Sequence, residues 1–445
     1  MTIADSAVPF RSQTANDPLV RLLEGRYTDT ENGASVAVAT RSLVIADTIA
    51  GSEADLVAGL DFGRRLAVIS DPATSQVLGA RVEAALKTRH DIASLVLPAN
   101  PHADDATVAR LRAAAGAVDA FIAIGSGTIN DLTKYVSALE GRPYAVFATA
   151  PSMNGYVSQT ASITVGGHKS TLPATPPVGA FFDLGVLSAA PKRLIRAGLG
   201  DSICRTTAQA DWLLSHLVIG TPYREAPFDL LLQDELQLLA QAADLIGGGI
   251  EAMRSLTRTL VLSGFGTAIV GSSAPASQAE HLVSHYIDML APAGRPLVFH
   301  GEQVGVTTLS IARLQHAMLQ ERPILRADGE TESAIRDRYG PALADSVLEE
   351  FAHKRMDRRR AEELNDMLAS SWSAIVDRIA SVLLPTASIE AALRAVGAPL
   401  SAADVHLDRA FYESALLHGR EIRNRFTVLD LAAGSGRLAP MLSSL

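Results

Sequence analysis

Residues 121–131 read FIAIGSGTIND, an apolar run that leads through small residues into a helical pattern. A buried strand, a tight turn and a helix form the unit from which α/β proteins are built. Small residues at such a turn expose backbone N–H groups at a helix N-terminus, where an anion such as a pyrophosphate is favoured. The stretch is neither a complete G-x-G-x-x-G nor a Walker A motif, because no Lys-Ser or Lys-Thr follows the glycines. A plain tight turn explains it about equally well.

The same unit recurs on both sides of this stretch. Apolar runs without polar alternation predict strands, and runs with helical spacing predict helices. Strands that alternate with helices in this way indicate a parallel sheet covered on both faces. The predicted strands are 66–71, 94–97, 121–124 and 144–148, and the predicted helices between them are 74–89, 104–115 and 129–139.

The pattern changes after residue 149. Residues 160–172 predict a hairpin that turns at 166–168, and a further apolar run follows at 178–182. We therefore expect an α/β domain at 1–190, with an N-terminal arm at 1–34 and a short helix near 19–23, and an all-α domain at 191–445. The helices expected in the second domain are 201–216, 229–246, 256–267, 279–290, 302–319, 331–339, 342–353, 361–383, 389–396 and 402–418.

Composition limits the kinds of function. The 445 residues are 48% hydrophobic and only 5% aromatic, which suits an α/β or α protein. Their net charge of −9 argues against non-specific binding to nucleic acid or to an anionic membrane. The single cysteine, Cys204, excludes an intrachain disulfide framework and fits a reducing compartment. We expect neither a signal peptide nor a membrane span, and hence a soluble, cytoplasmic protein.

Three histidines lie within 20 residues in the second half. His281 and His285 are four apart, so a helix would place both on one face, and His300 follows after a turn rich in Pro and Gly. Asp201, in the sequence Gly-Leu-Gly-Asp, is the best candidate for a carboxylate to join them. Two neutral imidazoles and one carboxylate can hold a divalent metal with an open coordination position, which is typical of a catalytic site.

Each of these residues also has an ordinary structural interpretation. Asp is a preferred helix N-cap, which would explain Asp201, and Glu302 could favour the first turn of a helix. A single histidine is most often a hydrogen-bonded core residue. The segment 428–436, VLDLAAGSG, resembles the first motif of methyltransferases that bind S-adenosylmethionine, but only nine residues follow it, and such a motif requires an α/β domain downstream.

Two further stretches could bind a ligand. Residues 149–156 follow the last predicted strand of the alternating series, at the carboxyl edge where open parallel sheets bind ligands. Asp71 ends the first predicted strand, where a carboxylate could bind a ribose hydroxyl. An ordinary loop explains the first stretch about as well, and a turn aspartate before Pro72 explains Asp71 slightly better.

Taken together, the stretches 127–131, 149–156, 198–201, 280–285 and 300–302 resemble, in order, those of glycerol-1-phosphate dehydrogenases. That family belongs with dehydroquinate synthase, glycerol dehydrogenase and the iron-containing alcohol dehydrogenases. The resemblance extends from about residue 40 to the segment 423–431. It implies a Rossmann-like domain, a helical domain and an active site in the cleft between them.

The resemblance also implies roles for individual residues. Asp201, His281 and His300 would bind zinc, nickel or iron, and His285 would position the substrate and relay a proton. Asp71 would bind the adenosine ribose of NAD or NADP. The remaining cofactor-binding residues would be Gly127, Thr128, Ile129, Asn130 and Asp131 at the pyrophosphate, with Thr149, Ser152 and Ser158 on the nicotinamide side.

Two positions depart from the family pattern. Asn154 stands where the family usually has Asp at a substrate-contacting position, and Arg205 stands where it usually has Lys. Asn can hydrogen-bond a hydroxyl but is no general acid or base, although by position it remains a candidate catalytic residue. Arg is longer, planar and always charged, so it is not equivalent to Lys. These departures affect the expected substrate more than the expected metal or nucleotide.

We therefore expect a metal-dependent oxidoreductase of phospholipid metabolism that interconverts dihydroxyacetone phosphate and sn-glycerol 1-phosphate with NAD(P), as a homodimer. Three alternatives remain open: a related polyol or polyol phosphate dehydrogenase, a sugar-phosphate cyclase of the dehydroquinate synthase type, and a catalytically silent homologue that binds the cofactor. A cyclase needs several basic residues for a carboxylate or phosphate, and Arg295 is the one basic residue around the histidine cluster.

Overall fold

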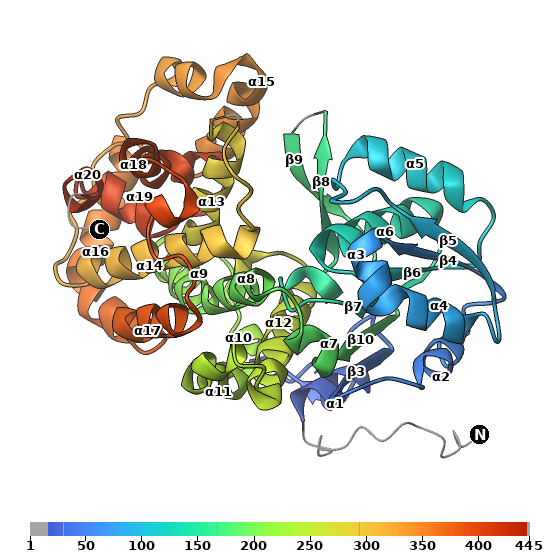
Figure 1. Ribbon diagram of the computed structural model, residues 1–445. Coiled ribbons are helices and arrows are strands. Elements are labelled where there is room, and N and C mark those ends of the chain that lie inside the picture. Colours follow the sequence, from blue (N-terminus) through green and yellow to red (C-terminus); the bar gives the residue numbers. More distant parts are fainter. Residues whose placement is uncertain (1–16, 30, 167, 293, 443–445) are drawn as a thin grey trace. The chain divides into compact units, whose positions relative to one another are not determined.

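The computed structural model describes residues 17–29, 31–166, 168–292 and 294–442 (Figure 1). The chain forms two compact units, one of Met1–Gly198 with Glu225–Gly271 and the other of Leu199–Arg224 with Ser272–Leu445. The segment Glu225–Gly271 thus groups with the α/β part of the chain, whereas the sequence placed it in the helical domain. The boundary expected near residue 190 stays a prediction.

A six-stranded parallel sheet forms the centre of the first unit, as the alternating pattern predicted. Its strand order is β3-β10-β7-β6-β4-β5, and every neighbouring pair is parallel. The central strands are buried along their whole length, which explains why their sequences lack polar alternation. The strands of the sheet are β3 (Ser42–Ala46), β4 (Arg65–Ser70), β5 (Asp91–Val96), β6 (Ala120–Gly125), β7 (Tyr144–Ala148) and β10 (Gly179–Asp183).

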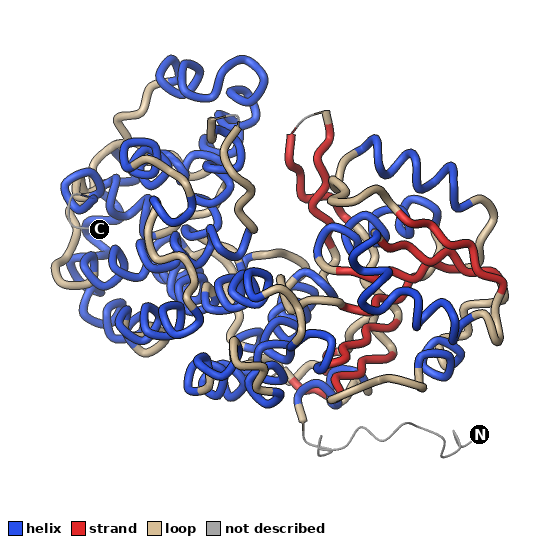
Figure 2. Tube along the Cα trace, viewed as in Figure 1, coloured by secondary structure: helices blue, strands red, loops and turns tan. Residues whose placement is uncertain are grey.

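Helices cover both faces of this sheet (Figures 1 and 2). The helices α5 and α6 pack on each other, as do α2 and α4, and the right-handed crossovers of parallel strands place these two pairs on opposite faces. The helices of this unit are α1 (Pro18–Leu23), α2 (Glu53–Ala58), α3 (Pro72–Thr74), α4 (Ala80–Leu86), α5 (Asp105–Ala115), α6 (Gly127–Glu140), α7 (Leu184–Ser188), the first half of α8 (Lys192–Ile203), α10 (Ala226–Asp229), α11 (Leu232–Ala240) and α12 (Ile250–Val270).

Smaller elements complete the first unit. The π-helical turn η1 (Ser75–Gly79) joins α3 to α4, and the 3-10 turns η2 (Gly155–Val157) and η3 (Ala242–Leu245) follow β7 and α11. The predicted hairpin is confirmed as the antiparallel pair β8 (Thr160–Val165) and β9 (His168–Pro173), although Gly167 of its turn lies outside the described residues. A second antiparallel pair, β1 (Tyr27–Thr28) with β2 (Ser35–Val36), was not predicted.

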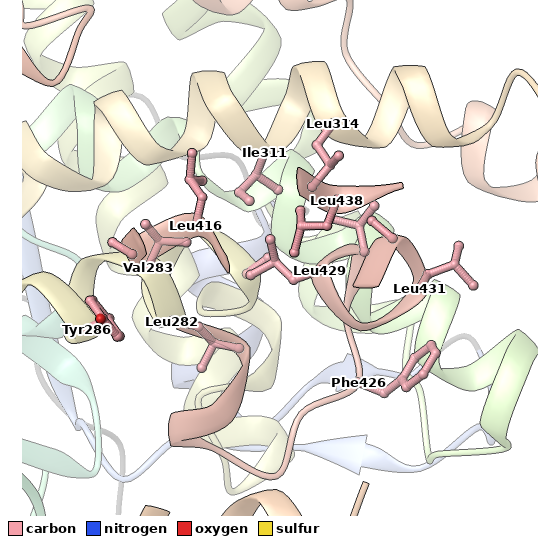
Figure 3. Packing of buried hydrophobic residues seen from close by; sticks show 14 of the residues in the cluster. Leu282, Val283, Tyr286, Ile311, Leu314, Leu416, Phe426, Leu429, Leu431 and Leu438 are labelled. Carbon is pink, nitrogen blue, oxygen red and sulfur yellow. The ribbon is translucent and has the colours of Figure 1, made fainter. Parts of the chain in front are cut away.

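In the described residues of the second unit, the regular elements are all helices, and the unit has its own apolar core. Figure 3 shows leucines of α13, α14 and α19 meeting around Leu429, and the core extends to α9, α15, α16 and α18. The helices are the second half of α8, α9 (Arg205–Ile219), η4 (Ala274–Ala276), α13 (Ala279–Leu290), α14 (His300–Met318), α15 (Glu332–Ala352), α16 (Arg358–Ala380), α17 (Thr386–Val396), η5 (Ala403–Val405), α18 (Arg409–His418), η6 (Gly419–Ile422), α19 (Val428–Gly434) and α20 (Leu438–Leu442).

Several predicted boundaries were wrong. The helix expected at 229–246 is split between α10, α11 and η3, and the one expected at 402–418 begins only at Arg409, where Asp408 caps it by accepting from the N–H of Phe411. The break expected between 339 and 342 is confirmed, because Gly340 has φ 69° inside α15. Among the described residues, the helices are all too short or too polar to cross a bilayer.

Candidate metal and nucleotide site

Asp201, His281 and His300 come together in the second unit. Oδ1 of Asp201 lies 3.8 Å from Nε2 of His281 and 3.9 Å from Nε2 of His300. The ligand atoms of the three residues all lie within 4.8 Å of one another. Two ligands of one tetrahedral zinc are separated by about 3.4 Å, since each lies about 2.1 Å from the metal. The three side chains therefore fit a single divalent cation, with positions left for a substrate.

Two glycines allow Asp201 to reach this place. Asp201 lies inside α8, so its interpretation as a helix N-cap is wrong. Gly198 and Gly200 lie inside this helix, and the backbone of other segments approaches both so closely that a side chain would not fit. A Cβ on Gly200 would overlap the carbonyl oxygen of Gly301, and a Cβ on Gly198 would overlap that of Pro151. The contact at Gly200 brings the start of α14, and with it His300, against the turn of α8 that carries Asp201.

Glu280 orients His281, a role that the sequence did not reveal. Its Oε1 lies 2.9 Å from Nδ1 of His281, so the imidazole directs its other nitrogen toward Asp201. Glu280 is fully buried and also accepts from the backbone N–H of Gln278 and the hydroxyl of Thr207. A carboxylate behind a histidine ligand fixes its tautomer and raises its basicity. The signal was the acidic residue directly before the first histidine.

The electrostatics of His281 reflect these neighbours. Burial opposes the charged imidazolium, but hydrogen bonds with Asp201, Cys204 and Glu280 outweigh it and hold the pKa of His281 well above its usual range. Cys204 is buried, and this burial raises the pKa of its thiol to about 12. Burial and the charge of Glu280 raise the pKa of Asp211 to about 7.

His285 and Glu302 complete this region. The ring of His285 lies 6.0 Å from those of both His281 and His300 and is nearly parallel to that of His300. His285 therefore stands beside the candidate ligands, one helical turn after His281. Glu302 accepts a hydrogen bond from the backbone N–H of Phe299 and so caps α14, which matches its ordinary interpretation.

The two departures from the family pattern lie in different units. In the second unit, Arg205 opens α9, is buried, and donates from Nη1 to Oε1 of Gln209 at 2.7 Å. In the first unit, Asn154 directly precedes η2, and its Nδ2 lies 3.5 Å from the hydroxyl of Ser263.

The predicted nucleotide-binding stretches meet at the carboxyl edge of the sheet. Residues 127–131 form the first turn of α6, directly after β6, as predicted. The N–H of Thr149 donates to the carbonyl oxygen of Gly125, which ties the ends of β7 and β6 together. A Cβ on Gly127 would lie 3.2 Å from the sulfur of Met153, a tight contact that would require the Met153 side chain to shift slightly. This is the arrangement in which open α/β sheets bind ligands.

The residues predicted to bind the cofactor at this edge of the sheet differ in solvent exposure. Ile129 and Asn130 are buried, so they would present backbone rather than side chain to a pyrophosphate. Asp131 accepts from the backbone N–H of Ser162. Asp71 caps α3 by accepting from the N–H of Thr74, as its ordinary interpretation expects. Thr128 and Ser152 are partly exposed, and Thr149 and Ser158 are largely buried.

The segment that resembles a methyltransferase motif is no nucleotide loop. Residues 428–434 form the helix α19, whose N-terminus is capped by the Thr427 hydroxyl, and the N–H of Val428 donates to Asp211. The segment therefore belongs to the helical core, as the sequence argument expected.

Known proteins share both the fold and parts of the sequence. The profile of the family "Iron-containing alcohol dehydrogenase" matches residues 44–191. A butanol dehydrogenase from Thermotoga maritima matches over 94% of this chain and 99% of its own, with a TM-score of 0.58 and 14% identity. A maleylacetate reductase from a Rhizobium strain matches over 90% and 95%, with a TM-score of 0.56 and 15% identity. The expected fold class is confirmed: a Rossmann-like α/β part with a helical part.

Two relatives are closer in sequence. A glycerol-1-phosphate dehydrogenase (NAD(P)+) from Pyrococcus furiosus is 33% identical over 279 residues, which cover 62% of this chain and 78% of the relative. One from Bacillus licheniformis is 28% identical over 385 residues, 85% of each chain. The chain belongs to the glycerol-1-phosphate dehydrogenase family, within the iron-containing alcohol dehydrogenases. The resemblance inferred from the motifs is confirmed, and the family is one of metal-dependent, NAD(P)-linked oxidoreductases.

Proposed function

We propose that this protein interconverts dihydroxyacetone phosphate and sn-glycerol 1-phosphate, using NAD(H) or NADP(H) and one divalent metal ion. The observation that carries the proposal is the convergence of Asp201, His281 and His300 on one point. The name shared by the relatives from P. furiosus and B. licheniformis supports the substrate. The substitutions at Asn154 and Arg205 leave a related polyol phosphate as the second choice.

The chemistry divides between bound groups and side chains. A metal ion held by Asp201, His281 and His300 supplies Lewis acidity toward the C2 oxygen, and the nicotinamide supplies or accepts hydride at C2. Glu280 keeps Nε2 of His281 free to be a ligand by holding Nδ1. His285 positions the substrate and relays the proton that belongs to the C2 hydroxyl. Asn154 acts as a hydrogen-bonding partner of a substrate hydroxyl rather than as an acid or base.

The nucleotide belongs at the carboxyl edge of the sheet. The backbone of residues 127–131 receives the pyrophosphate at the N-terminus of α6, a helix of 14 residues whose dipole favours the negative charge. Thr149, Ser152 and Ser158 lie on the nicotinamide side, and Asp71 binds the adenosine ribose. A carboxylate there disfavours the 2′-phosphate of NADP, so we expect NAD to bind more tightly.

The setting of the enzyme is part of the proposal. We place the domain boundary near residue 190, with the metal ligands and the substrate-positioning His285 supplied by residues of 191–445. The buried single thiol of Cys204 fits a reducing, cytoplasmic compartment, where stable disulfides are rare. A homodimer is expected from the family resemblance.

One assay tests the reaction and the metal together. The purified protein, loaded with Zn²⁺ or Ni²⁺, is expected to oxidise NADH or NADPH when dihydroxyacetone phosphate is added, and to lose this activity after chelation. Adding the metal back restores it. A net change of NADH also separates a dehydrogenase from a cyclase, which regenerates its NAD in each turnover. Turnover that survives complete chelation would refute the metal role, and binding without turnover on any polyol phosphate would support the silent homologue.

A matched pair of variants connects the activity to the site. His300→Ala is expected to lower kcat by at least 100-fold and to reduce the bound metal, because one of three protein ligands is removed. His353→Ala, at the C-cap of α15, is expected to change neither. Equal activity of the two variants would contradict the proposed site.

A further inference from the structure

A buried lysine lies behind the nucleotide edge of the sheet. Lys134 is in α6, seven residues after Gly127, and its side chain is fully buried. Its ammonium group lies 2.5 Å from the carbonyl oxygen of Gly155, 3.0 Å from that of Thr160 and 3.1 Å from the hydroxyl oxygen of Ser158. The acceptors thus come from one short stretch, residues 155–160, which leads into β8.

The chemistry of the group matches this arrangement. A lysine ammonium has three donors and no acceptor, and here three acceptors surround it. Burial disfavours the charge and lowers the pKa of Lys134 to about 8, although the carboxylate of Asp131, 3.8 Å away, opposes this effect. Burying an ammonium is costly unless it is paired and hydrogen-bonded, and a buried ion pair is weak evidence for stability alone. What the ammonium determines is the conformation of the segment that encloses it.

The segment has close packing on a second side as well. A Cβ on Gly264 of α12 would lie 2.6 Å from the carbonyl oxygen of Asn154. The hydroxyl of Ser158 lies within hydrogen-bond distance of Gly155 O and Thr160 O in addition to Lys134. The backbone between Asn154 and Thr160 is therefore held between α6 and α12.

This segment contains Ser158 and follows Thr149 and Ser152, the residues assigned to the nicotinamide side, and α6 begins at the residues assigned to the pyrophosphate. We propose that Lys134 is a positioning residue for the dinucleotide: it joins the segment 155–160 to α6, so that both halves of the nucleotide site keep one geometry. This inference rests on the proposed NAD(P) function and deepens it. Because Lys134 is fully buried behind the segment, it acts through that segment and does not touch the cofactor itself.

Lys134→Met tests this role, since it keeps the length of the side chain but removes every donor. In the metal-loaded enzyme we expect the Kd for NADH, measured by fluorescence titration, and the KM for NADH to rise at least tenfold. The bound metal and the KM for dihydroxyacetone phosphate should stay within twofold of wild type. This split separates a nucleotide-positioning role from a general loss of structure, which would affect all four quantities.

Lys87→Met is the matched control, because Lys87 is an exposed lysine of the same unit that pairs with Glu83. It should leave all four quantities at the wild-type level. A folded Lys134→Met enzyme whose Kd for NADH stays within twofold of wild type would overturn the proposal. A wild-type enzyme that binds neither nucleotide would instead refute the proposed function, so the two failures are distinguishable.

A second measurement needs no variant that could fail to fold. Deprotonation leaves Lys134 two donors for three acceptors, so the Kd of wild type for NADH should rise as the pH increases through about 8. Asp131 is the charge that acts on Lys134, and burial raises the pKa of the neighbouring phenols Tyr144 and Tyr156, which stay neutral in this range. A Kd that is constant from pH 7 to 9.5 would overturn the proposal even if Lys134→Met does not fold.

Discussion

Gly200 shows how one missing side chain positions a metal ligand. Its Cα faces the backbone of Gly301, where a Cβ would overlap the carbonyl oxygen. We expect Gly200→Ala to displace the start of α14 and with it His300, and to weaken metal binding at least tenfold. Overpacking of this kind also costs about 1–3 kcal/mol of stability. Metal affinity by competition with a chelator, together with thermal unfolding, measures both effects.

Gly329→Ala is the control for that substitution, because a Cβ at Gly329 meets no atom within 4 Å and its φ is not positive. It should change neither metal affinity nor Tm appreciably. If Gly200→Ala binds metal as tightly as Gly329→Ala, then the close approach of α8 and α14 does not set the position of His300.

Glu280 is the second residue whose effect reaches the metal indirectly. Glu280→Gln preserves the shape of the side chain but replaces the charged acceptor that faces Nδ1 of His281. Outer carboxylates of this kind typically contribute 10- to 100-fold to metal affinity, so we expect a loss of about tenfold. Glu53→Gln, at a buried carboxylate of the first unit that pairs with Arg81, should leave metal affinity unchanged. Equal affinities for the two variants would exclude the orienting role.

At the scale of elements, secondary structure was predicted most accurately where one hydrophobic pattern runs through the whole element and no close contact between backbones requires glycines in it. The strands β4, β6 and β7 were found because short, unbroken apolar runs between helical patterns are typical of buried parallel strands. The edge strand β3 was missed because its five residues are only half-buried and carry a weaker pattern. The helix expected at 201–216 corresponds mainly to α9, which begins at Arg205, whereas Asp201 lies in α8, a helix that was not predicted. The tertiary contacts that make the glycines of α8 necessary are not visible in the local sequence.

Helix α12 allows a test at this scale, because it packs directly on the segment that carries Asn154. In Gly264→Ala the new Cβ would lie 2.6 Å from the carbonyl oxygen of Asn154 and 2.8 Å from a methyl group of Val157. Either α12 or the segment must move, so we expect kcat/KM for dihydroxyacetone phosphate to fall at least tenfold while the metal content is unchanged. Steady-state kinetics and metal analysis measure this.

Gly247→Ala provides the comparison, since a Cβ there would meet its nearest neighbour, the carbonyl oxygen of Asp244, at an ordinary 3.6 Å. Wild-type kinetics in Gly264→Ala would show that the segment tolerates displacement, and that the packing of α12 does not define the substrate side of the site.

At the scale of the whole molecule, the candidate site was predictable because its chemistry is concentrated in few residue types. Three histidines close in sequence and one aspartate after two glycines sufficed to expect a metal site, and Asp201, His281 and His300 do converge. The residues that orient or hold this machinery, such as Glu280 and Lys134, were not predicted. Their roles depend on which atoms they face across the fold, and the local sequence does not show this, even where an acidic residue directly precedes a histidine.

Protons and the metal compete for His281, which gives the stability of the whole protein a characteristic pH dependence. In the metal-free protein the pKa of His281 is raised above the unfolded value of about 6.5. The protonated imidazole therefore stabilises the metal-free fold fully below about pH 6.5, and this contribution is lost as the pH rises through the folded pKa. The metal requires the neutral imidazole, so its affinity increases over the same range.

The difference in Tm between the metal-loaded and the chelated protein should consequently increase as the pH rises from 6 to 8.5. At a metal concentration 100 times the Kd, the bound ion contributes about 2.7 kcal/mol. Taking this difference at each pH removes the contribution to Tm of groups that titrate alike in both forms, including Asp211, whose pKa is raised to about 7. Asp201→Asn should reduce the difference at every pH, because it removes a ligand. A difference independent of pH would mean that His281 does not exchange its proton for the metal.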